Sequence, residues 1–420
     1  MSPLDAHRTV DAIWRIESPK LIAGLARMVR DVGLAEELAQ DAFVSALTQW
    51  PETGIPRNPG AWLMAIAKRR AIDRFRREEV RERKHQLIAR EIEPQDGPEA
   101  ALAALDDDDI GDDLLRLIFV ACHPVLSMEA RVALTLRLLG GLTTVEIARA
   151  FLVGEPAVAQ RIVRAKRTLS EARVPFEVPS KSERVARLAS VLEVLYLIFN
   201  EGYAATAGDD VMRPALCEDA LRLGRVLAQL TPDEPEVHAL VALMEIQASR
   251  SRARIGPSGE PILLLEQDRG KWDHLLIRRG LAALERTEAL GGALGIYALQ
   301  AAIAACHARA RTAAETDWPR IAALYDALAQ LLPSAVVRLN RAVAIGMAYG
   351  PAAGLELVDA LLPEPTLKAY HLLPSVRADL LEKLGRRSEA RDAYERAAAL
   401  AQNARDRTLL LERAARCARG

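Results

Sequence analysis

Apolar residues in this chain of 420 residues recur at helical spacing, and no segment shows a sustained alternation of apolar and polar residues. Such alternation marks half-buried β-strands, so its absence argues against sandwich and barrel folds. The composition agrees, because Ala, Leu and Arg dominate and aromatic residues make up only 4% of the chain. Half of the residues are hydrophobic, which is enough for buried cores. We therefore predict an all-α protein.

The strongest local pattern lies in residues 142–173 and predicts a helix, a tight turn and a second helix. Thr143 followed three residues later by Glu146 is a capping box that opens a short helix. Gly154 ends the turn, and Pro156 stands in the first turn of the next helix, where a proline costs no hydrogen bond.

The second of these helices has two different faces. Its apolar stripe, at spacings of four, three and four, is Val158, Ile162, Ala165 and Leu169. Its opposite side carries Ala157, Gln160, Arg161 and Arg164, followed by Lys166 and Arg167. A polar, basic outer face on the second helix of such a pair suits the major groove of DNA, where Gln and Arg contact base edges. The alternative is an ordinary helical hairpin with a solvated charged face.

A second basic helix is predicted over residues 59–77. Its apolar side includes Trp62, and its other positions carry Lys68, Arg69, Arg70, Arg74, Arg76 and Arg77, with Asp73 as the one acid. A basic face with an aromatic residue at its start suits backbone contact and stacking on unpaired bases. The alternative is a solvated basic helix with Trp62 in the core.

An acidic helix is predicted upstream, over residues 35–50. Its inward face is Leu38, Ala42, Phe43, Ala46 and Leu47, and its outward face is Glu36, Glu37, Gln40 and Asp41. An acidic helix beside a basic one is typical of a protein-docking surface.

Charge is distributed unevenly along the chain. The 56 basic and 57 acidic residues leave a net charge of −1, which excludes a uniformly basic nucleic-acid coat. Residues 66–90, however, carry a net charge of +6, and residues 93–113 carry nine acids and no Lys or Arg. The acidic run contains Pro and Gly. We therefore predict a linker over 91–113 that joins a helical domain at 1–90 to a helix-turn-helix domain at 114–175.

The C-terminal part is predicted to be a helical extension over 182–290 followed by helical repeats over 291–420. Gly350 and Gly385 are 35 residues apart, which is close to the period of tetratricopeptide repeats. Around the second glycine, packing positions of a helical hairpin are expected at Leu381, Leu384, Ala390, Tyr394 and Ala397. We predict a tetratricopeptide-like solenoid.

Together these motifs resemble the sigma-70 superfamily of bacterial RNA polymerase sigma factors. AEELAQDAFVSALTQW, AWLMAIAKRRAIDRFRR, an acidic linker, LTTVEIARAF and RIVRAKRTL stand in the order of conserved regions two and four. The small extracytoplasmic-function (ECF) type fits best, because little lies between the two regions. The resemblance covers about residues 10–175. It implies that region two docks on core RNA polymerase and opens the −10 promoter element, while region four reads the −35 element.

Site residues follow from this resemblance. The docking helix would present Glu36, Glu37, Gln40 and Asp41, and residues 51–60 would receive a flipped −10 base. The −10 contacts would be Trp62, Lys68, Arg69, Arg70, Asp73, Arg74 and Arg77. The −35 contacts would be Ala157, Gln160, Arg161, Arg164, Lys166 and Arg167. Arg69 replaces a common Asn, and Leu152 replaces the usual turn Gly, so the −10 preference and the turn geometry are expected to differ.

The extension resembles the subgroup with a fused tetratricopeptide-like domain, through YLIFNEGY, QDRGKWD and LNRA. This implies a regulatory extension that binds a regulatory protein or ligand. Its conspicuous polar residues are Asn200, Glu201, Gln267, Asp268, Arg269, Asp273, His307, Asp317 and Asn340. Buried polar residues in helical arrays usually tie turns and helix ends together. A ligand pocket is the alternative.

Several features argue against disulfide-rich, zinc-binding, enzymatic and secreted proteins. The four cysteines are far apart and none is in a C-x-x-C pair, so neither a disulfide framework nor a zinc finger is expected. We find no nucleotide-binding loop, nucleophile elbow or metalloprotease motif, and expect no catalytic residues, metal or cofactor. The N-terminus lacks the apolar run of a signal peptide, which predicts a cytoplasmic protein without membrane contact.

The partners implied by the resemblance would be core RNA polymerase and promoter DNA. The rivals are a ligand-responsive helix-turn-helix regulator with a repeat-type sensor domain, and a helical-repeat scaffold.

Overall fold

The computed structural model describes residues 3–86, 110–204, 212–257 and 259–419. These residues form α-helices and short 3-10 helices, and their β-type pairing is limited to isolated bridges, such as the one between Ile255 and Pro261. The all-α prediction is confirmed. The chain divides into two compact units, Met1–Leu195 and Tyr196–Gly420. None of the described helices is long and apolar enough to cross a membrane.

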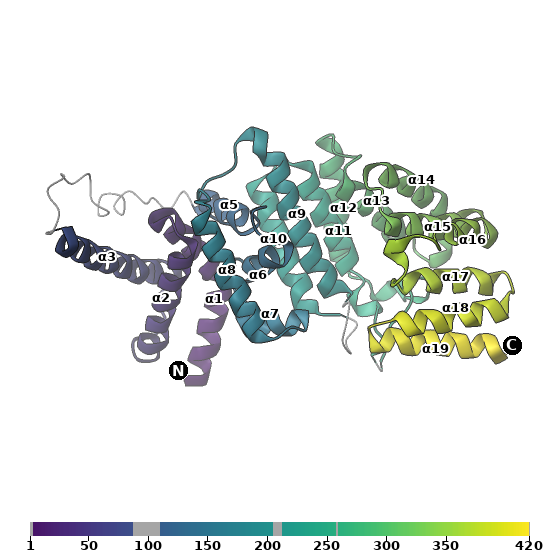
Figure 1. Cartoon of the computed structure of the whole chain (residues 1–420), viewed down its shortest axis with the longest axis horizontal. Coiled ribbons are helices and arrows are strands. Elements are labelled where there is room, and N and C mark those ends of the chain that lie inside the picture. Colours follow the sequence, from purple (N-terminus) through teal and green to yellow (C-terminus); the bar gives the residue numbers. More distant parts are fainter. Residues whose placement is uncertain (1–2, 87–109, 205–211, 258, 420) are drawn as a thin grey trace. The chain divides into compact units, whose positions relative to one another are not determined.

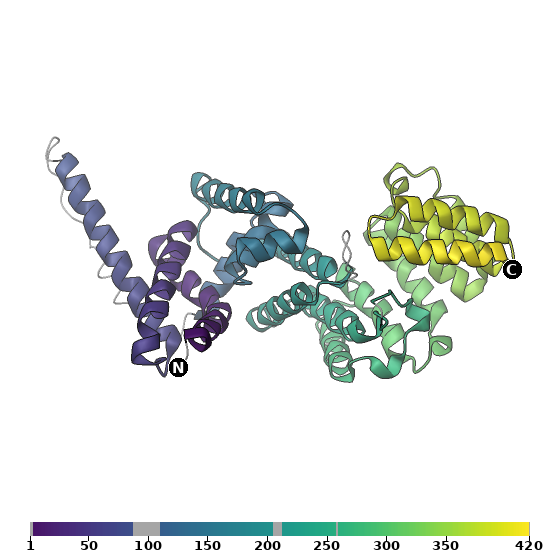
Figure 2. The same ribbon diagram turned by 90° about the horizontal axis from the view of Figure 1, so that it is seen from below.

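The first unit begins with three helices that form the first module. They are α1 (Pro3–Val29), α2 (Val32–Thr53) and α3 (Pro59–Gln86). Asp31 caps α2 by accepting a hydrogen bond from the Leu34 amide at 2.8 Å. Trp50 on α2 is fully buried and packs against Trp62 on α3, with ring centres 5.3 Å apart. Figure 2 shows α3 as one long, continuous helix that extends beyond α1 and α2.

Four further helices form the second module of this unit. They are α5 (Ile110–Ala121), α6 (Met128–Leu138), α7 (Thr144–Phe151) and α8 (Glu155–Glu171). The start of α5 corrects the predicted linker 91–113, because residues 110–113 are helical and Asp113 is buried against Arg27 at 3.2 Å and Arg116 at 2.6 Å. The rest of that prediction lies outside the described residues.

Helix α9 (Lys181–Tyr203) contains the division between the two units. Its N-terminal part packs in the first unit. Arg187 donates to the Phe119 carbonyl at 2.9 Å, and Ser190 donates to the Cys122 carbonyl at 2.7 Å. The start of the extension predicted at residue 182 therefore falls inside the first unit, because these hydrogen bonds tie this half of α9 to the end of α5 and the residue after it.

The second unit consists of helices that follow one another as hairpins (Figure 1). They are α10 (Pro214–Leu230), α11 (Pro235–Ala248), α12 (His274–Ala289), α13 (Ile296–Arg309), α14 (Trp318–Leu331), α15 (Ala335–Tyr349), α16 (Pro351–Asp359), α17 (Leu372–Lys383), α18 (Arg387–Leu400) and α19 (Ala404–Arg419). Gly350, at φ 105°, and Gly385, at φ 76°, form the predicted turns α15–α16 and α17–α18. Both have backbone conformations that favour glycine. Helical hairpins at this spacing are confirmed, while their assignment as tetratricopeptide-like repeats stays a prediction.

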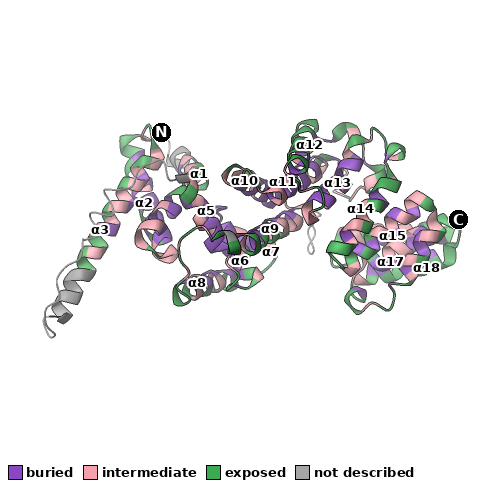
Figure 3. Ribbon diagram, turned by 90° about the horizontal axis from the view of Figure 1, so that it is seen from above, coloured by how far each residue is buried: buried purple, intermediate pink, exposed green. Residues whose placement is uncertain are grey.

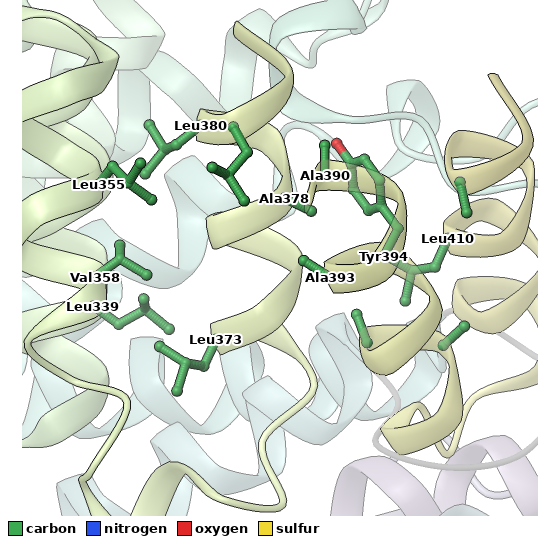
Figure 4. Packing of buried hydrophobic residues seen from close by; sticks show 14 of the residues in the cluster. Leu339, Leu355, Val358, Leu373, Ala378, Leu380, Ala390, Ala393, Tyr394 and Leu410 are labelled. Atoms are coloured by element: carbon green, nitrogen blue, oxygen red, sulfur yellow. The ribbon is translucent and has the colours of Figure 1, made fainter. Parts of the chain in front are cut away.

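The core of the last hairpins is made of small and large residues that interlock (Figure 4). Leu355 and Val358 on α16 pack toward α17, and Ala390 and Tyr394 on α18 pack between α17 and α19. Tyr394 is fully buried, and its hydroxyl donates to Glu382 at 2.8 Å. Most of the predicted packing positions are buried. Leu384 is an exception with 37% exposure, because it lies in the turn just after α17.

Candidate nucleic-acid interface

The helix-turn-helix forms as the sequence predicts. The Thr143 hydroxyl accepts from the Glu146 amide at 3.2 Å, and the Glu146 carboxylate accepts from the Thr143 amide at 2.8 Å, which completes the capping box of α7. Gly154 precedes α8, and Pro156 stands in its first turn. These local signals fix where both helices begin.

The turn between α7 and α8 keeps a conformation that normally belongs to glycine. Leu152 has φ 52° and ψ 40°, which is the left-handed region, and its side chain is 55% exposed. A side chain in this region costs about 1–2 kcal/mol of local strain. Leu152 thus takes the backbone conformation that a turn glycine would take. The turn keeps this conformation at an energetic cost, so the difference in backbone geometry that we expected at this residue is not seen.

The two faces of α8 are separated as predicted (Figure 3). The stripe of Val158, Ile162, Ala165 and Leu169 is buried. The opposite side, Ala157, Gln160, Arg161 and Arg164, lines a groove of about 480 Å³ together with residues that precede and begin α6. Within the described residues, Gln160, Arg161 and Arg164 make no side-chain hydrogen bond or ion pair. Their donors are therefore available to an outside partner.

The two other predicted −35 residues are already engaged. Arg167 pairs with Glu171 one turn later at 2.6 Å, and both side chains are exposed. Lys166 lies against the first module, where its ammonium group pairs with the carboxylate of Glu36. The prediction did not foresee that Lys166 is 79% covered, since helical spacing within α8 says nothing about a neighbouring module.

Glu36 corrects the predicted outward face of α2. Its side chain is 2% exposed, and its carboxylate accepts from Arg137 Nε at 2.6 Å, from Gln40 Nε2 at 2.6 Å and from Lys166. Burial by itself would raise the pKa of Glu36, but the charges of Lys166 and Arg137 outweigh burial and hold this pKa below its ordinary value. Sequence reasoning missed Arg137, because no pattern in α6 distinguishes it.

The remaining acidic residues of α2 face the arginines of α3. Glu37 pairs with Arg74 at 3.1 Å, and Asp41 pairs with Arg70 at 3.0 Å. They line a groove of about 700 Å³ with Leu38, Gln40, Asp73 and Arg77. The two sets that the sequence predicts separately, one for protein docking and one for DNA, therefore form a single mixed-charge surface on α2 and α3.

The remaining −10 residues lie along α3 outside these pairs. Trp62 is half-buried against Trp50. The buried part of its ring fits a place in the core, and the exposed part fits stacking on an unpaired base. Lys68 is half-buried and Arg69 is exposed. The predicted base-receiving segment 51–60 divides between the end of α2, a short loop, and the start of α3, where Asn58 accepts from the Ala61 amide at 3.1 Å.

The two modules also meet along α1, which no sequence pattern indicated. Trp14 Nε1 donates to the Gly141 carbonyl at 2.9 Å, and Arg15 pairs with Glu146 at 2.6 Å. With the Glu36 pairs and the Arg27–Asp113 pair, these contacts hold the modules together in this structure.

The conspicuous polar residues of the extension mostly tie helix ends and loops together. Asp273 accepts from the amides of Leu275 and Leu276 and caps α12, and Asp317 accepts from the Arg320 amide and caps α14. This supports structural tethering for those two residues. Within the described residues, no group of three or more His, Cys, Asp or Glu is placed to hold a metal ion.

Comparisons with known families match three parts of the chain. Residues 14–81 match Sigma-70 region 2, and residues 116–169 match Sigma-70, region 4. Residues 187–288 match a family of unknown function, DUF6596. The first two matches cover the modules that hold the surfaces described above, and the third covers the start of the extension.

Comparisons with individual proteins agree. The chain is 44% identical over 388 residues to an uncharacterized protein of Rhizobium meliloti (strain 1021). The aligned residues make up 92% of this chain and 90% of that protein. It is 30% identical to the probable ECF RNA polymerase sigma factor SigI of Mycobacterium tuberculosis (strain CDC 1551 / Oshkosh), over 45% of this chain and 63% of that protein. It is 29% identical to the ECF RNA polymerase sigma factor SigK of Mycobacterium bovis (strain BCG / Pasteur 1173P2), over 34% of this chain and 74% of that protein.

Proposed function

This chain belongs to the ECF sigma factors of the sigma-70 family, which initiate transcription, and we propose how its residues divide that work between polymerase and promoter. The partners implied by the family are core RNA polymerase and promoter DNA. We infer that it acts in the cytoplasm, where core polymerase works, and that it catalyses no reaction itself.

The outer face of α8 reads the −35 element in this proposal. The observation that carries it is the set of unengaged donors on Gln160, Arg161 and Arg164, on the second helix of a capped helix-turn-helix. Gln and Arg each make bidentate contacts to base edges in the major groove. Ala157 lies beside them and leaves room for a close approach. Arg167, and Lys166 once it leaves Glu36, contact phosphates.

The first module serves the polymerase and the −10 element. Glu37, Gln40 and Asp41 on α2, with Glu36 once it is freed, present oxygen and amide groups to core polymerase. The surface of α3 holds the opened −10 strand, with Trp62 stacking on a base and Lys68, Arg69, Arg70, Arg74 and Arg77 contacting its backbone. Asp73 lies on the same surface and places one negative charge among these cations.

The structure represents a closed form of the two modules in this proposal. The −35 and −10 elements are 25 base pairs apart, or about 85 Å along B-DNA at 3.4 Å per step. Here α8 touches α2 through Lys166 and Glu36, so one chain cannot reach both elements in this arrangement. The contacts between the modules must therefore break when the protein engages polymerase and promoter.

The test is transcription in vitro with purified core polymerase and a promoter selected from random sequence. We expect specific initiation that depends on this protein, and only weak binding of promoter duplex by the protein alone. The double variant Arg161→Ala, Arg164→Ala should abolish initiation, while Arg279→Ala, at an exposed position on α12, serves as the control. Tight, specific DNA binding by the free protein without any effect on core polymerase would favour an ordinary regulator instead.

A further inference from the structure

Three arginines and two aromatic residues gather in the second unit, where α11 leads through short 3-10 turns to α12. The guanidinium carbons of Arg250 and Arg269 lie 5.5 and 5.0 Å from the ring centre of Trp272. The guanidinium carbon of Arg254 lies 3.7 Å from the ring centre of Tyr203. With His307, whose carbonyl accepts from Arg269 at 2.6 Å, these residues form the arginine–aromatic cluster.

In the part of the chain that the structure describes, the three guanidinium groups find only neutral hydrogen-bond acceptors. Arg250 donates to the side-chain oxygens of Gln247 and Gln267, and Arg254 donates to the Tyr203 carbonyl. Arg269 donates to the carbonyls of His307 and Ala310 and to the Thr316 hydroxyl. Within the described residues none of the three forms an ion pair with a carboxylate, although Glu315 and Asp406 act on Arg269 and Arg254 at longer range.

The cluster also holds buried donors that have no acceptor. Trp272 Nε1 and Arg269 Nε are buried without a hydrogen-bond partner, and both groups can only donate. The Tyr203 hydroxyl and His307 Nδ1 are also buried without a partner, although either atom can accept as well as donate. Trp272 is 3% exposed and His307 is 8% exposed, so bulk water does not serve them. Among the described residues, the cluster therefore has more donors and positive charge than acceptors.

Electrostatics favour an added anion at this place. Burial and the charges of Arg254 and Arg269 lower the pKa of Arg250, and burial lowers the pKa of Arg269. Burial and the charges of Arg250 and Arg269 lower the pKa of His307 to about 4, so its ring is neutral at pH 7 and adds no charge. Half-buried cations that form no ion pair are costly, and an anion among them would relieve this cost.

We propose that the arginine–aromatic cluster is a binding site for a phosphate group, free or carried by a small molecule. Guanidinium groups present several N–H donors in a fixed fork that matches the oxygens of a phosphate. The Trp272 and Tyr203 donors supply further contacts. Structural tethering accounts for the Arg269 bonds to loop carbonyls. It does not account for three cations that form no ion pair within the described residues, or for the donors that have no partner there.

The test is calorimetric titration of the full chain with inorganic phosphate in chloride buffer at constant ionic strength. We expect one phosphate per chain. Arg250→Gln removes one cation and should weaken binding at least tenfold, whereas Arg279→Gln removes an exposed cation on α12 and should bind phosphate like the wild type. Glycerol phosphate is titrated in parallel. Tighter binding than inorganic phosphate indicates a phosphorylated metabolite, and weaker binding indicates free phosphate.

A second variant keeps the test independent of folding. Tyr203→Phe removes only one hydroxyl, and loss of a hydrogen bond to a charged group should lower phosphate affinity about tenfold. No phosphate binding by the wild-type chain would show that the cluster is neutralised from within the chain or by water, and would overturn the proposal. Equal phosphate affinity in the wild type and in each folded variant would overturn it as well.

Discussion

Glu36 is a full negative charge inside the first unit, held there by two cations from the second module. Replacing Glu36 with Gln leaves Arg137 and Lys166 without a counter-charge in a place where they are mostly covered. Removing one partner of a buried ion pair is costly, and we expect a loss of about 3 kcal/mol in the free energy of unfolding of the first unit at pH 7. Urea unfolding measures this loss.

The matched control is Glu37→Gln, one position along α2. Its pair with Arg74 is exposed on both sides, so we expect a loss below about 0.5 kcal/mol. Because the pKa of Glu36 is lowered in the folded chain, its contribution is complete above its unfolded pKa and is lost as the pH falls through its folded pKa. The difference between wild type and Glu36→Gln should therefore be constant near neutral pH and shrink in acid. Equal midpoints for all three proteins at pH 7 would contradict the buried pair.

These residues show what the sequence could and could not predict. The spacing of apolar residues correctly predicted the buried stripe of α8, because that stripe packs within its own module. The same spacing failed for Glu36 and Lys166, because their surroundings come from another module that is distant in the chain. No pattern in α6 distinguished Arg137, since its importance arises only from that long-range contact.

At the scale of the element, the turn of the helix-turn-helix carries strain at Leu152. Glycine at this position would adopt the left-handed conformation without strain, while its greater freedom in the unfolded chain offsets part of the gain. We expect Leu152→Gly to stabilise the first unit by about 0.5–1 kcal/mol, measured by urea unfolding. Val153→Gly is the control: its φ is not positive, so this variant should destabilise. A loss of stability in Leu152→Gly would contradict the strain.

The open face of α8 supports a prediction about base reading. Replacing Arg164 with Ala should cost about 1–3 kcal/mol at one −35 base and relax the preference there. Replacing Arg167, which pairs outside the groove with Glu171, should weaken binding evenly across sequences and reduce the salt slope by about one. Transcription from a panel of −35 variants at several salt concentrations measures both effects. If the two variants behave alike across the panel, the assignment of faces is wrong.

At the scale of the whole molecule, α9 decides where the extension can be removed. Residues 181–195 belong to the first unit, where Val191, Leu192 and Val194 are buried and Ser190 bonds to the Cys122 carbonyl. A chain that ends at Lys181 loses this packing, so its first unit should unfold at lower urea concentration than that of a chain ending at Leu195. Only the longer truncation isolates the contribution of the extension.

We propose that the extension regulates the sigma modules, and the chain ending at Leu195 tests this role. Because α9 runs without a break from the first unit into the second, a change in the extension has a direct helical connection to the module that reads the −35 element. We expect transcription from a cognate promoter to change severalfold when residues 196–420 are removed, and the sign of the change shows whether the extension inhibits or activates. Urea unfolding of the truncated chain controls for folding. Transcription equal to that of the full chain, in phosphate and in chloride buffer, would rule out a regulatory role for the extension under those conditions. It would not test the phosphate site, which the calorimetric titration tests separately.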